Sequence, residues 1–216
     1  MKQKTAVELH YNLPPDYYQR SIKINPLQWF WHHRRFKNIS QLIEPVEGEI
    51  LDIGSADGTF TEIIINQSKA TKVIGIDILE SSVKYANQRF KKDKRMEFLV
   101  ADAHHLPFAN NRFAAAFCLE AMEHVFNPQK VLGEIKRVLK PNGYLNILVP
   151  TDSFLFKIAW WFVLHSWGKH WRETHLQSFR QKNSLALALK KAGFKIERDK
   201  KFLLNMLEAV KARKND

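Results

Sequence analysis

The chain has 216 residues, of which 45% are hydrophobic and 26% charged, a composition that excludes a disordered or fibrous protein. Its 34 Lys and Arg residues exceed its 22 Asp and Glu residues, and the net charge of +12 favours anionic partners such as RNA, an anionic membrane surface or an acidic metabolite. A single cysteine, Cys118, excludes an intrachain disulfide and a multi-cysteine metal site. The length suits one α/β domain with embellishments.

The N-terminal sequence lacks the apolar core of a secretory signal. No stretch of the chain reaches the roughly 18 uncharged apolar residues that a membrane-spanning helix needs. We therefore expect a cytoplasmic protein, with association to a membrane surface as an additional expectation. No feature of the sequence indicates an oligomeric state.

The first 45 residues precede the first predicted strand and contain "NPLQWFWHHRRFKNISQLI" (25–43), a predicted helix that mixes aromatic and basic residues. From Glu49 onward, short apolar runs alternate with segments of helical periodicity. The turn residues Pro141 and Gly143 are expected to separate the third helix of this region from the fifth strand. Strands are expected at 49–54, 72–78, 96–102, 113–121 and 144–150, and helices at 59–69, 81–92 and 131–139.

Residues 151–177 interrupt this alternation with the aromatic sequence "TDSFLFKIAWWFVLHSWGKHWRETHLQ". Beyond it, a helix over 184–192 and closing strands at 194–200 and 202–214 are expected. Strands that alternate with helices predict an α/β fold with a mostly parallel sheet of seven strands and helices on both faces. We interpret residues 1–216 as a single domain with a helical cap (1–45), a core (46–150), an insertion or lid (151–177) and closing elements (178–216).

The sequence "EILDIGSADGTF" (49–60) places a glycine-containing loop between the first strand and the first helix of the core. In an open parallel sheet, ligands bind at such a loop. A dinucleotide-binding fingerprint would require glycines where Ala56 and Thr59 stand, and no Gly-Lys-Ser/Thr of a phosphate-binding P-loop is present. The glycines are instead Gly54 and Gly58, four residues apart, with small residues between them.

That spacing, after "LD" and before a helix, resembles motif I of the class I S-adenosylmethionine-dependent methyltransferases. Three further segments match this family in order: Asp77 at the end of the second strand, "ADAHHLPF" (101–108) with Asp102, and "FCLEAMEHVFNPQKVLGEIKRVLKPNGYLNILVP" (117–150). The last segment is similar to the methyltransferase type 11 group. The resemblance covers about residues 46–150 and implies a Rossmann-like fold and S-adenosyl-L-methionine as the cofactor. It implies that the cofactor-binding residues are Asp52, Gly54, Ser55, Ala56, Gly58, Asp77, Ile78, Asp102, Ala103 and Leu119.

The resemblance gives the two later acids separate roles, because Asp77 would hold the ribose hydroxyls and Asp102 would contact the adenine amino group. An aspartate offers two acceptors to two vicinal hydroxyls, which agrees with the first role. Both acids also fit the alternative of a helix N-cap. His104 and His105 are interpreted as loop residues at the edge of the pocket. Where the family commonly has glycine this chain has Ala56, whose methyl group would lower cofactor affinity if the position requires a positive φ.

Glu120, Glu123 and His124 follow the fourth predicted strand, near the position that the resemblance implies for the reacting methyl group. Methyl transfer mainly requires that the nucleophile is held about 3 Å from the methyl carbon and that water is excluded. His124 is the first candidate for a catalytic base, because a neutral imidazole has a suitable pKa, and Glu120 is the second. A histidine that caps or packs a helix is the alternative.

The E-x-x-E-H pattern formed by these three residues also resembles the metal ligands of ubiquinone-biosynthesis O-methyltransferases and of small-RNA 2′-O-methyltransferases. Two carboxylates and an imidazole suit a divalent ion that polarises an acceptor hydroxyl. Other type 11 members carry E-H at this position with no metal implied. We therefore expect no metal.

The aromatic sequence 154–171 is interpreted as a lid over an apolar acceptor pocket or as an interfacial helix on an anionic membrane. Trp160, Trp161 and His165 are the predicted substrate-binding residues. Packing against the N-terminal segment is the structural alternative. We expect a small apolar or amphiphilic acceptor, lipid-like or quinone-like, that is methylated on oxygen or nitrogen.

Two other functions remain as alternatives. An RNA methyltransferase is favoured by the net charge, by "HHRRFK" (32–37) and by Trp29 and Trp31 as stacking groups. Against it, the basic residues are spread along the chain and no RNA-binding module is recognisable. A catalytically inactive binding protein with the cofactor fold is suggested only by Ala56.

Overall fold

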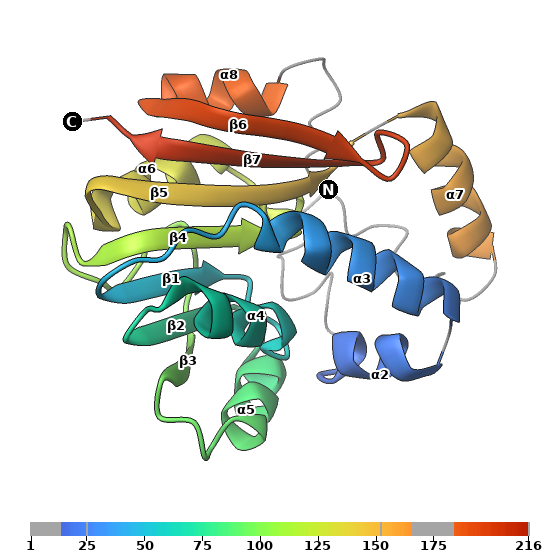
Figure 1. Cartoon of the computed structure of the whole chain (residues 1–216), viewed down its shortest axis with the longest axis horizontal. Coiled ribbons are helices and arrows are strands. Elements are labelled where there is room, and N and C mark those ends of the chain that lie inside the picture. The colour runs from blue at the N-terminus through green and yellow to red at the C-terminus, as the bar shows by residue number, and fades with distance from the viewer. Residues whose placement is uncertain (1–13, 25, 152, 166–183, 216) are drawn as a thin grey trace, which may run out of the picture.

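The computed structural model of the chain describes residues 14–24, 26–151, 153–165 and 184–215. Figure 1 shows a twisted sheet with helices on both sides, and α7 beyond one end of it. The second part of the aromatic sequence, from residue 166, lies outside the described residues. The side chain of Trp160 also lies outside them.

Seven strands form one sheet in the order β3-β2-β1-β4-β5-β7-β6. The first five strands of that order are parallel to their neighbours, whereas β7 pairs antiparallel with both β5 and β6. This arrangement confirms the expected α/β fold with a mostly parallel, seven-stranded sheet. The strands are β1 Glu49–Ile53, β2 Lys72–Asp77, β3 Met96–Val100, β4 Phe113–Leu119, β5 Leu139–Pro150, β6 Phe194–Phe202 and β7 Leu207–Lys214.

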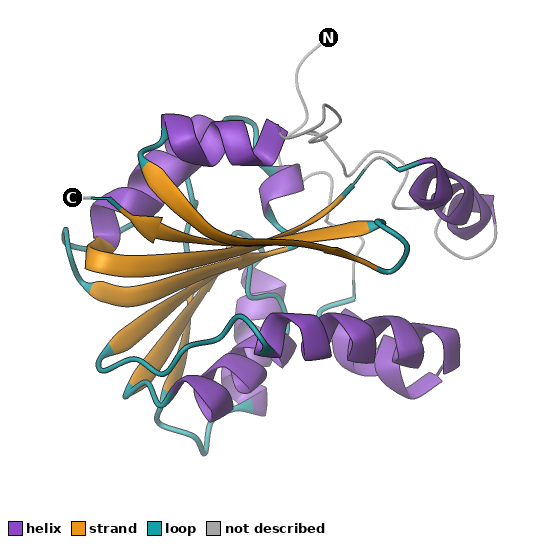
Figure 2. Cartoon of the chain, turned by 45° about the horizontal axis from the view of Figure 1, so that its top comes forward, coloured by secondary structure: helices purple, strands orange, loops and turns teal. Residues whose placement is uncertain are grey.

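The helices cover both faces of the sheet, as Figure 2 shows. Apolar residues of α6 and α8 pack in one buried cluster, and apolar residues of α3 and α4 pack in the cluster on the other face. A smaller cluster joins α5 to β3. The helices are α2 Tyr17–Ile24, α3 Pro26–Ser40, α4 Thr59–Ser68, α5 Glu80–Arg89, α6 Pro128–Val138, α7 Phe154–His165 and α8 Ser184–Lys191, with a 3-10 turn, η1, at Met122–His124.

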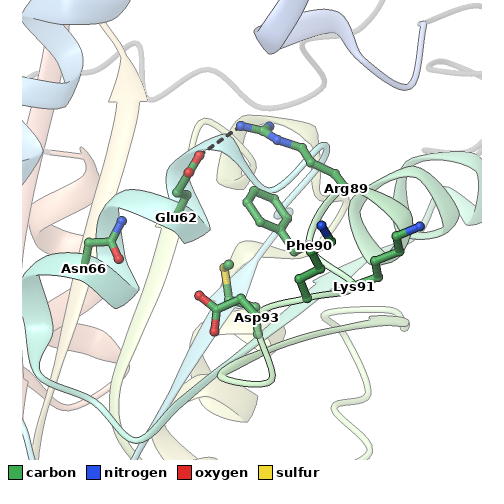
Figure 3. Close-up of a pocket in the computed structure, with 8 residues that line it drawn as sticks. Glu62, Asn66, Arg89, Phe90, Lys91 and Asp93 are labelled. Atoms are coloured by element: carbon green, nitrogen blue, oxygen red, sulfur yellow. Dashed lines mark hydrogen bonds and ion pairs between the residues drawn. The ribbon is translucent and has the colours of Figure 1, made fainter.

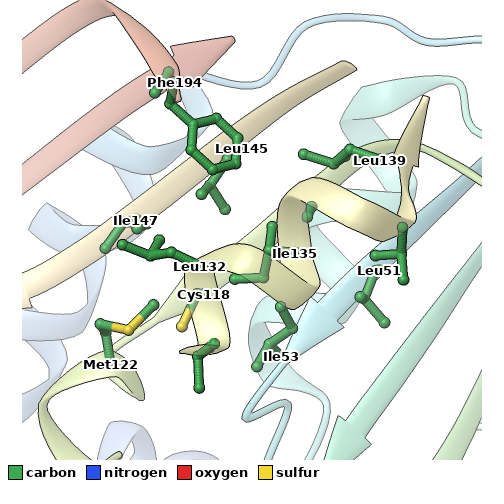
Figure 4. Packing of buried hydrophobic residues seen from close by; sticks show 14 of the residues in the cluster. Leu51, Ile53, Cys118, Met122, Leu132, Ile135, Leu139, Leu145, Ile147 and Phe194 are labelled. Carbon is green, nitrogen blue, oxygen red and sulfur yellow. The ribbon is translucent and has the colours of Figure 1, made fainter. Parts of the chain in front are cut away.

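The larger apolar cluster explains why the core strands read as continuous apolar runs. β1 and β4 lie in the middle of the sheet, so nearly all of their side chains are buried on one face or the other. Figure 4 shows Leu132 and Ile135 of α6 lying over Ile147 of β5 and Cys118 of β4. Cys118 is therefore a buried core residue.

The segment that follows α3 is held against strands β5 and β7 by polar contacts. The side-chain amide of Asn146, in β5, donates to the carbonyl oxygen of Leu42 at 3.0 Å, and the hydroxyl of Tyr144 donates to that of Glu44 at 3.0 Å. The carboxylate of Glu44 also forms an ion pair with the buried Lys211 of β7. These contacts set the direction in which α3 leaves the sheet.

Three local features differ from the sequence-based expectation. The predicted N-terminal helix over 25–43 is present as α3, but a separate helix, α2, precedes it. β5 begins at Leu139 rather than at Tyr144, because Leu139 already pairs with Phe113. Residues 140–143 lie in a register shift between this pair and the next one, so the predicted turn is a bulge within the strand. No helix in the described part of the chain is long and apolar enough to cross a bilayer.

Candidate active site

A pocket of about 400 Å³ lies at the carboxyl ends of β1, β2 and β4, where ligands bind in open α/β sheets. Its size is in the range of small-molecule sites. Its walls come from three parts of the chain: the start of α2, the loops after β1 to β3, and the segment after β4. The lining residues are Pro14, Pro15, Tyr18, Ile53, Gly54, Ala56, Asp57, Ile76, Asp77, Ile78, Leu79, Ser82, Ala101, Asp102, Ala103, His104, Glu120, Ala121, His124, Val125 and Phe126.

The glycine loop turns sharply at three alternate residues with positive φ: Gly54 at 72°, Ala56 at 45° and Gly58 at 77°. A Cβ on Gly54 would lie 2.4 Å from the Cβ of Ala121, so only glycine permits this approach of the loop to the segment after β4. Ala56 therefore has a positive φ, the conformation in which its methyl group is expected to lower the affinity for the cofactor. A left-handed alanine costs about 1–2 kcal/mol relative to a favoured conformation.

Asp77 lies at the end of β2 and lines the pocket. Its Oδ1 accepts the N–H of Leu79 at 2.9 Å, and its Oδ2 accepts the N–H of Ala56 at 3.0 Å. Each carboxylate oxygen can accept more than one hydrogen bond, and these two contacts orient the carboxylate. This geometry fits a bidentate contact with two vicinal hydroxyls, and it also locks the glycine loop to β2.

Asp102 follows β3 and is linked through His104 to the start of α6. Its Oδ1 accepts the backbone N–H of His104 at 2.9 Å and the ring Nδ1–H at 2.7 Å, while Nε2 of the same ring accepts the N–H of Asn127 at 3.2 Å. Partial burial alone would raise the pKa of Asp102, but the hydrogen bonds from His104 outweigh it and hold the pKa below its usual value. Asp102 therefore stays ionised at neutral pH and can accept a donor from a ligand.

Glu120 follows β4 directly and is held by the N-terminal helices. Arg35 of α3 donates to Oε2 of Glu120 in a nearly buried ion pair, and the hydroxyl of Tyr18, in α2, lies 3.5 Å from the same oxygen. Arg35 also lies over the rings of Tyr18 and Phe60, at 5.6 and 5.4 Å from their centroids. Beside it, burial and the positive charge of Arg35 lower the pKa of His32 to about 2, which keeps this imidazole neutral.

Glu120 has a φ of 56°, a conformation that is rare for a residue with a side chain. This strained residue lies where the chain leaves β4 and enters the pocket wall. The ion pair with Arg35 already engages this carboxylate, which argues against Glu120 as the base. His124, four residues later, also lines the pocket.

Glu123 points away from the pocket and into the protein. Its side chain is buried, its Oε2 accepts no hydrogen bond, and burial raises its pKa to about 8. Among the described residues, Glu120, Glu123 and His124 form no cluster that could hold a metal ion. The structure thus places the three residues of the E-x-x-E-H pattern in different environments.

The start of α2 is attached to the glycine loop. The backbone N–H of Gln19 donates to Oδ2 of Asp57 at 2.9 Å, and Oδ1 of Asp57 accepts the N–H of Thr59 at 3.0 Å. A single buried carboxylate therefore caps the first turns of both α2 and α4. The hydroxyl of Tyr85 donates to the side chain of Gln19 and fastens α2 to α5 as well.

A second hollow, of about 440 Å³, lies between α4 and the end of α5 (Figure 3). Arg89 crosses it to Glu62 at 2.9 Å, and the same guanidinium donates to the carbonyl oxygen of Asp57 at 3.1 Å and to the hydroxyl of Thr59 at 2.8 Å. None of its lining residues belongs to the pocket at the strand ends. The hollow therefore lies behind the glycine loop, where Arg89 supports the loop.

Eight predicted site residues line the pocket: Gly54, Ala56, Asp77, Ile78, Asp102, Ala103, Glu120 and His124. Asp52, Ser55 and Leu119 are buried behind it, and Gly58 turns the chain into α4. Burial raises the pKa of Asp52 to about 7, and its Oδ2 accepts the hydroxyl of Thr61 at 2.6 Å. Trp161 and His165 lie exposed on α7 and do not line the pocket.

The contribution of the N-terminal helices to the pocket wall was not predicted from the sequence, in which "HHRRFK" was interpreted as one basic patch. The structure divides this hexapeptide between two faces of α3: His32 and Arg35 are buried, whereas His33, Arg34 and Lys37 are exposed. The spacing of His32, Arg35, Ile39 and Leu42 is the signal that could have identified the inward face. Trp31 packs against the core and is not an exposed stacking group.

Comparisons with known proteins agree with this geometry. Residues 51–147 match the family model described as a methyltransferase domain, of type 11. The demethylmenaquinone methyltransferase of Clavibacter sepedonicus is 34% identical over 109 residues, which are 50% of this chain and 44% of the relative. The ubiquinone/menaquinone biosynthesis C-methyltransferase of Desulfotalea psychrophila is 29% identical over 134 residues, which are 57% of this chain and 54% of the relative.

A crystal structure of an S-adenosylmethionine-dependent methyltransferase from Aquifex aeolicus has a TM-score of 0.66 at 22% identity and covers 94% of this chain and 99% of its own. That likeness shows a shared fold. The chain spans about half the length of the curated relatives it matches. Residues 51–147 therefore match the methyltransferase domain family, in agreement with the resemblance drawn from the sequence.

Proposed function

We propose that this protein transfers a methyl group from S-adenosyl-L-methionine to a small amphiphilic acceptor with a quinone-like or phenol-like ring. The observation that carries the proposal is the division of one pocket into two ends. Asp77 and Asp102 lie at one end, beyond β2 and β3, and Glu120 and His124 lie at the other, beyond β4. A donor held by the two acids would direct its reactive end toward the second pair.

The residues present fit this cofactor. The glycine loop brings backbone atoms close to the pocket, and the carboxylate of Asp77, oriented by the N–H groups of Ala56 and Leu79, offers two acceptor oxygens for the two ribose hydroxyls. Asp102, whose pKa is held down by His104, can accept the adenine amino group. When bound, the cofactor supplies an electrophilic methyl group on a sulfonium that leaves as a neutral thioether. The protein's task is then to orient the acceptor, exclude water and accept a proton.

The acceptor end of the pocket favours an apolar molecule. Pro14, Pro15, Val125 and Phe126 line the pocket, and none of its described lining residues is a lysine or an arginine. The names of both relatives concern quinone biosynthesis or a menaquinone precursor, which supports a quinone-like ring. One of those names specifies methylation on carbon, so the acceptor atom includes ring carbon beside the oxygen or nitrogen expected from the sequence.

His124 is the proposed base. Removal of a phenolic proton increases the electron density on the oxygen and on the ring carbons, so one base serves either acceptor atom. Glu120, paired with Arg35, is proposed to position the N-terminal helices and the pocket wall rather than to accept the proton. An acceptor with an apolar tail resides in a bilayer, so we also propose that the protein meets it at a membrane surface.

The test is a turnover assay with methyl-labelled S-adenosylmethionine and a panel of water-soluble quinols, tailed quinols in detergent, and transfer RNA. We expect label in the quinol fractions, and a loss of roughly 100-fold in kcat for His124→Gln with the cofactor Kd unchanged. Label in RNA alone would replace the proposal by the RNA alternative. Absence of cofactor binding in calorimetry would favour the inactive binding protein.

A further inference from the structure

Exposed apolar side chains gather at the end of the sheet where the pocket lies. Among the described residues, eight large apolar side chains are strongly exposed, and six of them belong to α3, α7 and the turn between β6 and β7. Figures 1 and 2 both show the two helices beyond the carboxyl ends of the parallel strands. Single exposed apolar residues are common, whereas such a grouping marks an interaction surface. The six are Trp29, Phe30, Phe154, Ile158, Trp161 and Leu204.

The outward face of α3 combines aromatic rings with cations. Trp29, Phe30, His33, Arg34 and Lys37 are all exposed and recur at the spacing of one helix face. The two rings are each about half exposed, at 49%. Because the opposite face is fixed to the core and to the pocket wall through Arg35, this outward face cannot be buried by a rotation of the helix.

The outward face of α7 repeats the pattern. Phe154, Lys157, Ile158, Trp161 and His165 are exposed at the same helical spacing. On both helices a tryptophan is followed four residues later by a histidine whose Nδ1–H donates to the tryptophan carbonyl oxygen at 2.8 Å. In both pairs the imidazole lies on the indole, with ring centroids 3.9 and 4.3 Å apart.

The turn between β6 and β7 adds a third apolar point. Leu203, Leu204 and Asn205 all have positive φ, and the side chain of Leu204 is 74% exposed. The turn lies at the carboxyl end of β5, because Leu207 pairs with Pro150. Three consecutive residues thus have a backbone conformation that is sparsely populated. The N–H of Thr151 donates at 2.9 Å to the carbonyl oxygen of Met206, the next residue, and so holds the turn in place.

The charge of this surface is of one sign. Neither α3 nor α7 contains an acidic residue, and the outward faces carry Arg34, Lys37 and Lys157. Apolar rings flanked by cations, with no carboxylate, complement an anionic bilayer, where the rings enter the interface and the cations remain with the headgroups. Tryptophan in particular prefers this depth.

We propose that Trp29, Phe30, Arg34 and Lys37 of α3, Phe154, Lys157 and Trp161 of α7, and Leu204 together form a docking surface for an anionic lipid bilayer. This inference deepens the proposed function and uses it only to explain why docking is useful: the surface lies at the same end of the sheet as the pocket, so docking would present the pocket to a tailed acceptor. An RNA partner fits less well. Base stacking requires open ring faces, and one face of Trp29 is covered by His33, while Arg34 lies 5.9 Å from the Phe30 centroid.

The test measures binding of the full chain to sedimented vesicles without cofactor or acceptor. We expect binding to vesicles of phosphatidylcholine with about a third of phosphatidylglycerol, and much weaker binding to pure phosphatidylcholine. Trp29→Ser with Phe30→Ser should reduce the affinity for the anionic vesicles by roughly ten-fold or more, because the two rings that would enter the bilayer are lost. Arg34→Gln with Lys37→Gln should reduce it about ten-fold and remove much of its salt dependence.

Matched controls lie on α8, on the other face of the sheet. Leu187→Ser removes an apolar side chain that is 64% exposed, and Lys190→Gln with Lys191→Gln removes two exposed cations. Both controls should bind vesicles like the parent. Equal losses in the controls and the α3 variants, or no binding of the parent to anionic vesicles, would overturn the docking surface. Salt-dependent binding to RNA, lost in the Arg34 and Lys37 variant without any vesicle binding, would replace it by a nucleic-acid surface.

The two proposals fail in distinguishable ways. If the proposed function is wrong, no quinol is methylated, whereas vesicle binding and its loss in the α3 variants are unaffected. If the docking surface is wrong, the Trp29 and Phe30 variant binds vesicles like the parent, whereas turnover of a water-soluble quinol is unaffected. A thermal unfolding curve that matches the parent is required of each variant, and the α7 pair Phe154→Ser and Trp161→Ser gives an independent second measurement of the same surface.

Discussion

Arg35 in α3 donates to the carboxylate of Glu120, the residue that follows β4, across 85 positions of sequence. The side chains are only 4% and 16% exposed, so the pair is largely desolvated. It connects the N-terminal helices to the pocket wall at the place where Glu120 has a positive φ. The geometry of the pocket therefore depends on a residue outside the segment that matches the methyltransferase domain family.

Removal of one partner of this pair should be costly. Arg35→Met leaves the carboxylate of Glu120 without its cation, and we expect the free energy of unfolding in urea to fall by about 3 kcal/mol. The matched control is Arg34→Met, which removes an exposed guanidinium from the neighbouring position and should change stability by less than about 0.5 kcal/mol. Similar effects of the two substitutions on stability would show that the ion pair does not hold the N-terminal helices against the pocket wall.

Substitution of Asp77 should weaken cofactor binding. Asp77→Ala removes the acceptors expected to hold the ribose hydroxyls, so we expect a loss of on the order of 2–4 kcal/mol in the binding free energy measured by calorimetry. The substitution also removes the acceptors for the N–H groups of Leu79 and Ala56, so part of the loss reflects a looser glycine loop. Asp93→Ala, which removes a partly exposed carboxylate that does not line the pocket, is the control. Parent-like cofactor affinity in Asp77→Ala would refute the ribose assignment.

Gly58 should tolerate no side chain, for a reason that the structure supplies. A Cβ here would lie 2.6 Å from the ring of Phe90 and 2.8 Å from that of Phe98, on the side of the loop away from the pocket, and φ is positive. Gly58→Ala should therefore lower the stability by about 2–3 kcal/mol. Gly133, in α6, has no heavy atom within 4 Å of an added Cβ, so Gly133→Ala should raise stability by about 0.5–1 kcal/mol. Melting temperatures that move in the same direction would contradict this assignment.

Two buried carboxyl groups should make the stability depend on pH. Burial raises the pKa of Glu123 to about 8 and that of Asp52 to about 7, both above the value of about 4 in an unfolded chain. Between pH 4 and pH 8 these two groups therefore bind more protons in the folded state than in the unfolded state, and their contribution to the free energy of unfolding falls as the pH rises. The lowered pKa of His32 acts in the opposite direction below about pH 6.5, so the fall is clearest above that pH.

Glu123→Gln removes one of these groups and should reduce the fall between pH 5 and pH 9 by roughly 2–4 kcal/mol, measured by urea unfolding at several pH values. Glu62→Gln removes a partly exposed carboxylate as the control and should leave the slope unchanged. A parent protein whose stability rises over this range would contradict the burial of both groups in the neutral form.

Chelation should leave turnover nearly unchanged. The two acids of the E-x-x-E-H pattern are engaged separately, Glu120 by Arg35 and Glu123 by burial, so a divalent ion would have to displace the first and expose the second. Turnover of a quinol acceptor is the measurement, with and without a strong chelator. Loss of activity on chelation and recovery with magnesium or manganese would return the metal interpretation to first place.

The sequence by itself determined the parts of this protein that depend on local pattern. Alternation of apolar runs with helical periodicity gave the parallel core, because strand and helix each impose their own spacing on buried side chains. The loop with Gly54 and Gly58 and the acid at the end of β2 were identifiable for the same reason, since each lies within a few residues of its strand. Their roles toward the cofactor remain predictions.

Only the tertiary structure decided what the polar residues near this loop contact. Arg35 and Arg34 are neighbours in the sequence, yet one is buried against Glu120 and the other is exposed, because the packing of α3 sets which side faces the core. Likewise Glu120 and Glu123 differ by one turn of chain, and burial alone separates the paired carboxylate from the neutral one. Ion pairs and burial depend on contacts between distant segments, and a local sequence pattern does not determine which distant segment will contact a given residue.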